Sequence, residues 1–498
     1  MENKTSTKKI FVNSIIYSAS GILLKCFNFF LLPLYTTYLT TEDYGITSIA
    51  VSFINTAAFI VAFSLFSAVM RFYVDLKSDQ VRLKRFYGTV STFIFISSLC
   101  FFALLTAFRG IVSEKVFSGV DYYPVILICL ISLVFHCQQV IYDNILRSQQ
   151  RALKSSILSI AYFFSTFAFN IIFVVILKKG AVGSLLATMI SYVIYTIYFH
   201  VSMNIKHEIT YCFDWKLLKD ALKYSIPILP HNLSTNIAQL ISKVLISGSS
   251  SLASVGIYTV ASQFGSIADT IQVYVDQAYG PWLYEKLHDR DEGYKEAIRR
   301  ISKVLCVVIG FFFIAIGLFA QDYIVLLINK SYADAWKYVP LIVLVFAIKT
   351  VYYFYVEVLF YYKKASKYLF TATLSSSLLN ILLSYWLIPL LDVYGSILAD
   401  AISMIIRVVI IGFISNKYEK IGLQMRDFIT NFFVIAIFLG MGLAPSYLLW
   451  GGQFSIKNLA YKIVVLGVYI GIFYFRYRDD IRPLVAMAKS KLLRKKSD

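Results

Sequence analysis

The sequence contains few charged residues and few prolines. Asp, Glu, Lys and Arg make up 15% of its 498 residues, and only 9 residues are proline. A soluble domain is about one quarter charged. By contrast, 58% of the chain is hydrophobic and its mean hydropathy is +0.70. The apolar residues fall in runs of roughly twenty, the length of a helix that crosses a ~30 Å hydrocarbon core. A soluble multidomain protein is therefore excluded, and an all-α polytopic membrane protein is expected.

Residues that carry enzyme or metal chemistry are also scarce. The chain has 5 histidines and 6 cysteines, and the cysteines are scattered without a Cys-x-x-Cys motif. It has no glycine-rich phosphate loop and no Ser/His/Asp set at a recognisable spacing. His136 and His231 stand alone, and packing is the ordinary role of such histidines. We therefore expect a protein that is not an enzyme, with no cofactor and no metal.

Fourteen apolar segments are long enough to be membrane spans. We predict spans at residues 11–32, 44–70, 86–107, 122–143, 156–177, 181–202, 224–247, 252–276, 301–320, 338–361, 369–390, 394–414, 428–449 and 458–475. The net charge is +19, but most of the 47 Lys and Arg residues lie in alternate loops and in the C-terminal tail. Because positive loops stay cytoplasmic, both termini are predicted to be cytoplasmic. The same distribution argues against nucleic acid as a partner.

The chain resembles itself at an offset of about 212 residues, the mark of an internal repeat. Gly183–Ser191 and Gly395–Ser403 are identical at six of nine positions, and Asp43–Ala50 resembles Ser254–Ala261. A repeat of six spans enters the membrane twice from the same side, so its halves are related by a pseudo-two-fold axis along the membrane normal. Arg151–Lys154 and residues 364–367 are a third matching pair.

The repeat predicts the domain organisation of the chain. We expect a six-helix lobe at 1–205, a second six-helix lobe at 206–415, two extra helices within 416–475 and a basic cytoplasmic tail at 476–498. The extra helices are compatible with a groove for a lipid tail, with oligomerisation, or with neither. The tail is expected to lie along the anionic inner leaflet or to act only as a topology anchor.

Several predicted spans carry polar residues at helical spacing. A charge near the bilayer centre costs roughly 3 kcal/mol, so binding is the default interpretation of such residues. The candidate residues for binding a substrate are Lys25, Arg71, Asn232, Asn236, Gln239, Lys243, Lys349 and Arg407. The candidates for ion coupling are Asp269, Asp400 and Glu357.

Structural alternatives stay open for these candidates. Lys243 lies near the end of its span, where a lysine can extend its amine to the interface. Lys349 and Glu357 lie two turns apart on one span and can form a structural pair. Asp400 and Arg407 are seven residues apart and can also bridge each other.

Five short motifs, in order along the chain, resemble one transporter family. They are Leu32–Leu34 with Tyr38–Gly45, Leu146–Arg151, Tyr224–Pro230, Val255–Tyr258 and Gly280–Trp282. Together they resemble Wzx-type polysaccharide flippases of the multidrug/oligosaccharidyl-lipid/polysaccharide (MOP) superfamily. That family often has an Asp before a basic residue in its seventh span, where this chain has Ser242 and Lys243. The role of that Asp is therefore not carried over.

The resemblance implies a 14-helix bundle in the bacterial cytoplasmic membrane. Such a protein moves undecaprenyl-diphosphate-linked oligosaccharide units from the inner to the outer leaflet by alternating access, for O-antigen, capsule or exopolysaccharide. The expected partners are this lipid-linked substrate, H+ or Na+, membrane lipids, and polysaccharide polymerase or assembly proteins. Arg71, Lys25 and Arg407 are expected to hold the phosphates, and the amides of span 7 are expected to meet the sugar.

Two other functions are compatible with so apolar a chain. A MATE-type ion-coupled multidrug exporter shares the two-lobe organisation, but it favours a carboxylate-dominated cavity for an organic cation. A membrane-embedded polysaccharide polymerase needs a long outer loop that carries catalytic residues, whereas the predicted outer loops are short.

Overall fold

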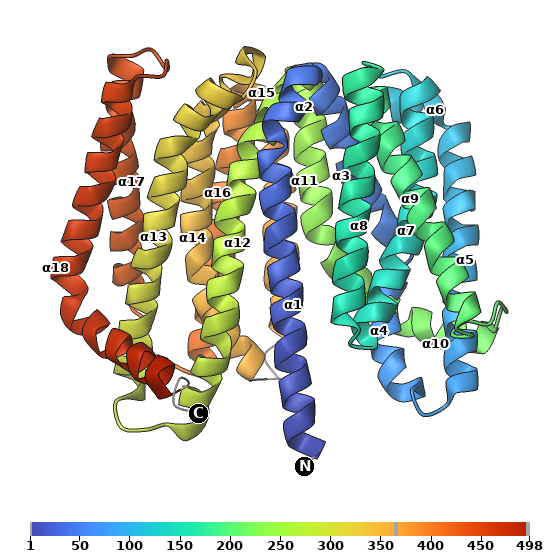
Figure 1. Ribbon diagram of the computed structural model, residues 1–498, viewed down its shortest axis with the longest axis horizontal. Helices are drawn as coiled ribbons and strands as arrows, with labels where there is room; N and C mark the ends of the chain where they lie inside the picture. Colours follow the sequence, from blue (N-terminus) through green and yellow to red (C-terminus); the bar gives the residue numbers. More distant parts are fainter. Residues whose placement is uncertain (1, 363–366, 495–498) are drawn as a thin grey trace. The chain divides into compact units, whose positions relative to one another are not determined.

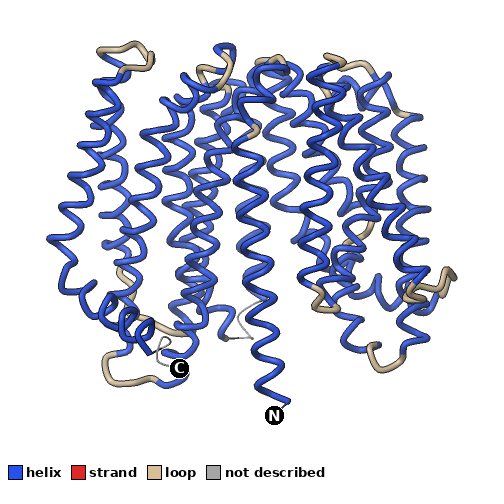
Figure 2. Tube along the Cα trace, viewed as in Figure 1, coloured by secondary structure: helices blue, strands red, loops and turns tan. Residues whose placement is uncertain are grey.

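The described part of the chain folds into helices joined by short connections. The computed structural model describes residues 2–362 and 367–494. In these ranges every regular element is a helix, and Figure 2 shows no strand. The predicted fold class, an all-α polytopic membrane protein, is confirmed. Residues 364–366, part of one repeat match, lie outside the described residues.

Twelve helices of the described chain are long and apolar enough to cross a membrane, and each coincides with a predicted span. The two remaining predicted spans correspond to α11 (Leu229–Ser249) and α12 (Leu252–Asp289), which contain 21 and 38 residues. At 1.5 Å per residue, both helices reach across a ~30 Å core. They differ from the other twelve because polar side chains lower their hydropathy.

One compact unit comprises residues 1–259 and 377–396. Its complete helices, labelled in Figure 1, are α1 (Glu2–Phe30), α2 (Leu32–Tyr38), α3 (Thr41–Val61), α4 (Leu65–Leu76), α5 (Gln80–Ala107), α6 (Arg109–Ile111), α7 (Leu127–Ser148), α8 (Ala152–Asn170), α9 (Gly180–Ile205), α10 (Trp215–Ser225) and α11. The short amphipathic helix α10 packs across the ends of α4 and α5, and it buries Leu217, Leu218 and Ala221.

The second predicted span is divided in the structure. Helix α3 ends at Val61, and Phe63 and Ser64 have positive φ angles of 47° and 55° before α4 begins at Leu65. Left-handed backbone at two successive non-glycine residues interrupts helical hydrogen bonding. The two halves of this span are therefore separate helices with independent directions.

Asp43 joins the starts of two helices. The Thr40 side chain accepts a hydrogen bond from the Asp43 backbone N–H, and the Thr40 N–H donates to Asp43 Oδ2, which completes a capping box. Asp43 Oδ1 also accepts from the Ala181 N–H, at 2.9 Å, in the first turn of α9. A carboxylate is favoured at both sites because helix N-termini carry unpaired N–H groups.

Gly45 of α3 and Gly256 of α12 allow two helices to touch through their backbones. A Cβ on Gly45 would lie 1.9 Å from the Leu252 carbonyl oxygen, and a Cβ on Gly256 would lie 2.0 Å from that of Thr41. Next to this contact, Thr259 Oγ1 donates to Ser48 Oγ at 2.7 Å, across a separation of 211 residues. Each contact joins positions that are equivalent in the internal repeat, as a pseudo-two-fold axis between them requires.

The second unit comprises residues 260–376 and 397–498. It contains α13 (Tyr294–Leu327), α14 (Ala335–Tyr361), α17 (Met425–Leu448) and α18 (Ile456–Arg494), together with most of α12 and parts of α15 (Lys367–Leu391) and α16 (Val393–Tyr418). Its aromatic core includes Tyr279, Phe354 and Phe428. The lobe boundaries at 205/206 and 415/416 are predicted from the sequence repeat, whereas the two units are defined by which residues pack together. The lobe boundaries therefore stay a prediction.

A buried ion pair attaches α18 to α13 in this unit. Lys462 is fully buried, and its Nζ lies 2.8 Å from Asp322 Oδ2 and 2.6 Å from Gln321 Oε1. Such a pair is costly to break because the remaining charge is left without compensation. The last helix of the chain is thus held by charge as well as by apolar packing.

We predict that Gly45→Ala destabilises the protein. Its methyl group would meet the Leu252 carbonyl oxygen at 1.9 Å, and overpacking of this kind costs about 1–3 kcal/mol or more. The matched control is Gly248→Ala in α11, where nothing lies within 4 Å of the added Cβ. The midpoint of thermal unfolding in detergent measures both. Equal midpoints for the two variants would contradict the close helix contact.

Candidate functional site

The polar residues of α11 face α3 and α4 within the first unit. Asn232 Nδ2 donates to Ser64 Oγ at 3.3 Å and to Ser67 Oγ at 3.1 Å, where α4 begins. The backbone carbonyl oxygen of Asn236 accepts from Thr56 Oγ1 at 3.3 Å. The side-chain amide of Asn232 therefore ties α11 to the break in the second span, whereas Asn236 contacts α3 only through its backbone. Gln239, on the same helix, is exposed.

Lys243 carries a charge that its neighbours do not neutralise. Its Nζ donates to Ser52 Oγ of α3 at 2.7 Å, and the side chain is partly buried. Within the described residues no carboxylate forms a salt bridge with Lys243. A hydroxyl stabilises an ammonium group much less than a carboxylate does. This lysine is therefore a source of positive potential inside the membrane-spanning part of the first unit.

Three other cations of the first unit have different surroundings. Lys25 is exposed on α1. Arg71 is half exposed on α4, and its Nη1 lies 2.6 Å from Asp75 Oδ1 one turn later. Arg151, just before α8, forms a two-bond contact with Glu208, at 3.0 and 2.7 Å. That contact raises the pKa of the Arg151 guanidinium above its usual value and offsets its charge.

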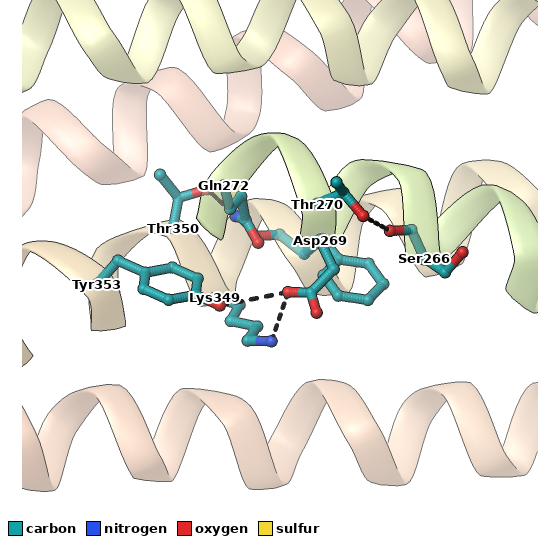
Figure 3. Close-up of polar contacts among 8 residues, drawn as sticks. Ser266, Asp269, Thr270, Gln272, Lys349, Thr350 and Tyr353 are labelled. Atoms are coloured by element: carbon teal, nitrogen blue, oxygen red, sulfur yellow. Dashed lines mark hydrogen bonds and ion pairs between the residues drawn. The ribbon is translucent and has the colours of Figure 1, made fainter. Parts of the chain in front are cut away.

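Asp269, Lys349 and Tyr353 meet in the second unit, and Figure 3 shows their contacts. Lys349 Nζ of α14 lies 2.6 Å from Asp269 Oδ1 of α12. The Tyr353 hydroxyl donates to the same oxygen at 3.3 Å. The ammonium group also lies 5.4 Å from the ring centres of Phe346 and Tyr353, a distance at which cation–π attraction operates.

This ion pair remains accessible from outside the protein. The Lys349 side chain is 21% exposed and the Asp269 side chain is 31% exposed. A pair in this position can exchange its partners for a ligand or a proton, which a fully buried pair cannot do. Gln272 fixes the helix spacing beside it by donating to the Phe346 carbonyl oxygen at 2.6 Å.

Glu357 and Lys349 have different bonding partners. It is 8% exposed and accepts a hydrogen bond from the Tyr284 hydroxyl. A Cβ on Gly280 would lie 2.8 Å from Glu357 Oε2, so only glycine leaves room for this carboxylate. Lys349 thus pairs with Asp269 on a neighbouring helix, and the alternative of a pair between Lys349 and Glu357 is not the arrangement found.

The last two candidates lie on α16. Arg407 is partly buried, and its Nε donates to Ser376 Oγ of α15 at 2.7 Å. Asp400 is partly buried two turns earlier on the same helix. In the described ranges, no group of three or more His, Cys, Asp or Glu side chains could hold a metal ion. The transport roles assigned to all eleven candidates stay predictions.

The fold is that of a known class of multi-pass membrane transporters. A structure of the lipid II flippase MurJ in an inward closed conformation matches with a TM-score of 0.68 and 18% identity, over 94% of this chain and 100% of that chain. An inward-facing MATE family transporter of the MOP superfamily matches with a TM-score of 0.55 and 16% identity, over 85% and 94% of the two chains. A variant of the Vibrio cholerae MATE transporter VcmN gives 0.54 and 16%, over 83% and 97%.

A sequence profile of the polysaccharide biosynthesis protein family matches residues 10–285, more than half of the chain. The chain therefore belongs to this family. No curated protein sequence matches it. The resemblance stated from the short motifs is confirmed to this extent: the chain belongs to the polysaccharide biosynthesis protein family and shares the fold of MurJ and of MATE transporters.

We predict that Asp269→Asn lowers stability and that adding Lys349→Met recovers much of the loss. Removing one partner of a buried pair costs about 3–5 kcal/mol, and partial exposure reduces this to about 1–3 kcal/mol here. The free energies of unfolding of the wild-type protein, both single variants and the double variant, measured by thermal unfolding, form a double-mutant cycle. Asp75→Asn, in the half-exposed pair with Arg71, is the control and should change little. Additive losses in the double variant would argue against the pair.

Proposed function

We propose that this protein is a flippase that moves a lipid-linked, phosphate-bearing oligosaccharide from the cytoplasmic to the outer leaflet for surface polysaccharide synthesis. The substrate is an undecaprenyl-diphosphate-linked repeat unit, and the mechanism is alternating access between two six-helix lobes. The proposal includes a location in the bacterial cytoplasmic membrane with both termini inside, and no catalytic step.

Membership of the polysaccharide biosynthesis protein family is the observation that carries this proposal. The chain shares its fold with a lipid II flippase over 94% of its length, and such a fold is compatible with a lipid-linked cargo. A glycan and a diphosphate cannot cross hydrocarbon unaided because their polar groups would lose water without replacement. In our proposal, polar groups of the protein replace the hydrogen bonds that water makes with the glycan and the diphosphate.

Lys243 is the residue best suited to attract the diphosphate. Its ammonium has a neutral hydroxyl as partner, that of Ser52, so a phosphate oxygen would gain a charge-assisted bond that displaces only a weaker one. Arg407, which donates to Ser376 Oγ, is the corresponding cation of the second unit. Arg71 and Arg151 already contact carboxylates, which makes them weaker candidates for the phosphate.

The pair of Asp269 and Lys349 is suited to exchange. While the two are bonded, at 2.6 Å, their charges cancel. An arriving phosphate competes with Asp269 for Lys349, and the released carboxylate then favours a proton or a sodium ion. Asp400 and Glu357 are further carboxylates that could take part. In this way substrate binding and ion binding would be linked by one ammonium group.

The membrane potential assists the proposed direction of transport. Moving one charge through 100 mV is worth about 2.3 kcal/mol, so a diphosphate with two negative charges gains about 4.6 kcal/mol by leaving an inside-negative cell. Ion exchange would add to this. Polysaccharide polymerase or assembly proteins on the outer side would then consume the product.

We predict that Lys243→Met reduces export of polysaccharide about tenfold or more. A bond to a charged group contributes about 1.5–3 kcal/mol, and each 1.36 kcal/mol changes a rate tenfold. Lys243→Arg keeps the charge and should retain most activity. The measurement is surface polysaccharide per cell, with intracellular lipid-linked oligosaccharide, in cells where the variant replaces the chromosomal copy.

The matched control is Lys330→Met, which removes the same charge at an exposed position. Export at the wild-type level by Lys243→Met, with a normal amount of protein in the membrane, would be incompatible with a phosphate-binding role for this residue.

A MATE-type multidrug exporter is the second candidate, favoured by the fold match to MATE transporters. It predicts efflux of cationic dyes that depends on Asp269, Asp400 or Glu357. Fluorescent dye accumulation in cells lacking other exporters separates the two functions, because a polysaccharide flippase leaves dye accumulation unchanged.

A further inference from the structure

A cavity opens between α13, α17 and α18, entirely within the second unit. It has about 950 Å³ of atom-free space, its open mouth included. These three helices pack against one another, and they lie side by side in Figure 1. None of the residues that line the cavity is a candidate residue for transport.

The mouth of this cavity is strongly positive. Arg299, Lys303, Arg426 and Arg476 line it together with a single acid, Asp427. Asp427 Oδ2 lies 3.0 Å from Arg299 Nε and 3.2 Å from Lys303 Nζ, so this carboxylate is shared by two of the four cations. The lining residues carry three net positive charges, and Glu296, outside the lining, lies 3.9 Å from Arg299 Nη1.

Arg426 and Arg476 are the cations available to a ligand. Both line the cavity and are exposed. In the described part of the chain, neither guanidinium forms a salt bridge with a carboxylate. A guanidinium group without a carboxylate partner is well matched to a phosphate, because its planar donors can bind two phosphate oxygens at once.

Along the three helices, away from these cations, the lining becomes apolar. Val307, Val434, Phe438 and Ile472 form part of this wall. The site is thus charged at one end and apolar at the other, which matches an amphipathic molecule with an anionic head. All four cations lie at or near the ends of spans that are predicted to be cytoplasmic, and the inner leaflet is the anionic leaflet of the membrane.

We infer that this cavity binds an anionic glycerophospholipid of the inner leaflet. Arg426 and Arg476 hold the lipid phosphate, and an acyl chain lies against Val434 and Phe438. The bound lipid fills the space between α13 and the α17–α18 hairpin and stabilises the packing of these last two helices. This inference does not depend on the proposed cargo, because it concerns a resident lipid rather than a transported one.

The test measures lipid retained by the full-length protein. Purified protein is delipidated, incubated with dioleoylphosphatidylglycerol or dioleoylphosphatidylcholine, and analysed by native mass spectrometry. We expect phosphatidylglycerol to bind more tightly than phosphatidylcholine and to raise the thermal unfolding midpoint. In R426Q/R476Q the affinity for phosphatidylglycerol should fall roughly ten- to thirtyfold, since each basic residue near an anionic headgroup contributes about one factor of five.

Two further variants separate charge from shape. R82Q/R85Q removes two arginines near the start of α5, in the other unit and outside this cavity, and it should leave binding unchanged. Val434→Trp keeps all four cations but fills the apolar wall, and it should also weaken phosphatidylglycerol binding.

Three outcomes would overturn the inference. The first is wild-type affinity for phosphatidylglycerol in R426Q/R476Q. The second is equal affinity of the wild-type protein for phosphatidylglycerol and phosphatidylcholine, which would indicate an apolar groove without headgroup recognition. The third is displacement of phosphatidylglycerol by undecaprenyl diphosphate at equal concentration, which would assign the cavity to the transported lipid.

Discussion

The contact between Gly45 and Gly256 is the constraint on which much of the first unit depends. Two helix backbones approach so closely that a single added carbon would meet a carbonyl oxygen at about 2 Å. Small residues permit such approach in membranes, where packing rather than water exclusion drives helix association. The hydroxyl bond between Ser48 and Thr259 is adjacent to it. Together they fix where α3 lies, and with it the serines that face α11.

Ionisable groups within the spans are bonded in two distinct ways. Asp322 with Lys462 is closed off from its surroundings, and its role is attachment of a helix. Asp269 with Lys349 is partly exposed, while Lys243 has only a hydroxyl. Burial thus separates charges that maintain structure from charges that remain available to a ligand. A cargo with phosphate groups would bind the charges that remain available, such as those of Lys243 and Lys349.

The sequence predicted the spans well, because span length and apolar composition are set by the bilayer itself. It also identified the polar stripe of α11. It did not predict the break at Phe63 and Ser64. Phe and Ser residues are also common in the neighbouring helices, so their presence does not indicate a positive φ angle. Asp269 and Lys349 are 80 residues apart, so their pairing depends on helix packing. Lys462 reads as a cation at the edge of its span, yet the fold buries it.

The bond between Ser48 and Thr259 has a meaning for how this chain arose. Its two ends are equivalent positions of the repeat, as are the two glycines beside it. A contact in which one surface patch meets its own copy about a two-fold axis is the isologous interface of a homodimer. A six-helix ancestor could have dimerised through this patch before duplication and fusion joined the copies. Fusion then freed each half to diverge, so that α3 now faces a lysine on α11.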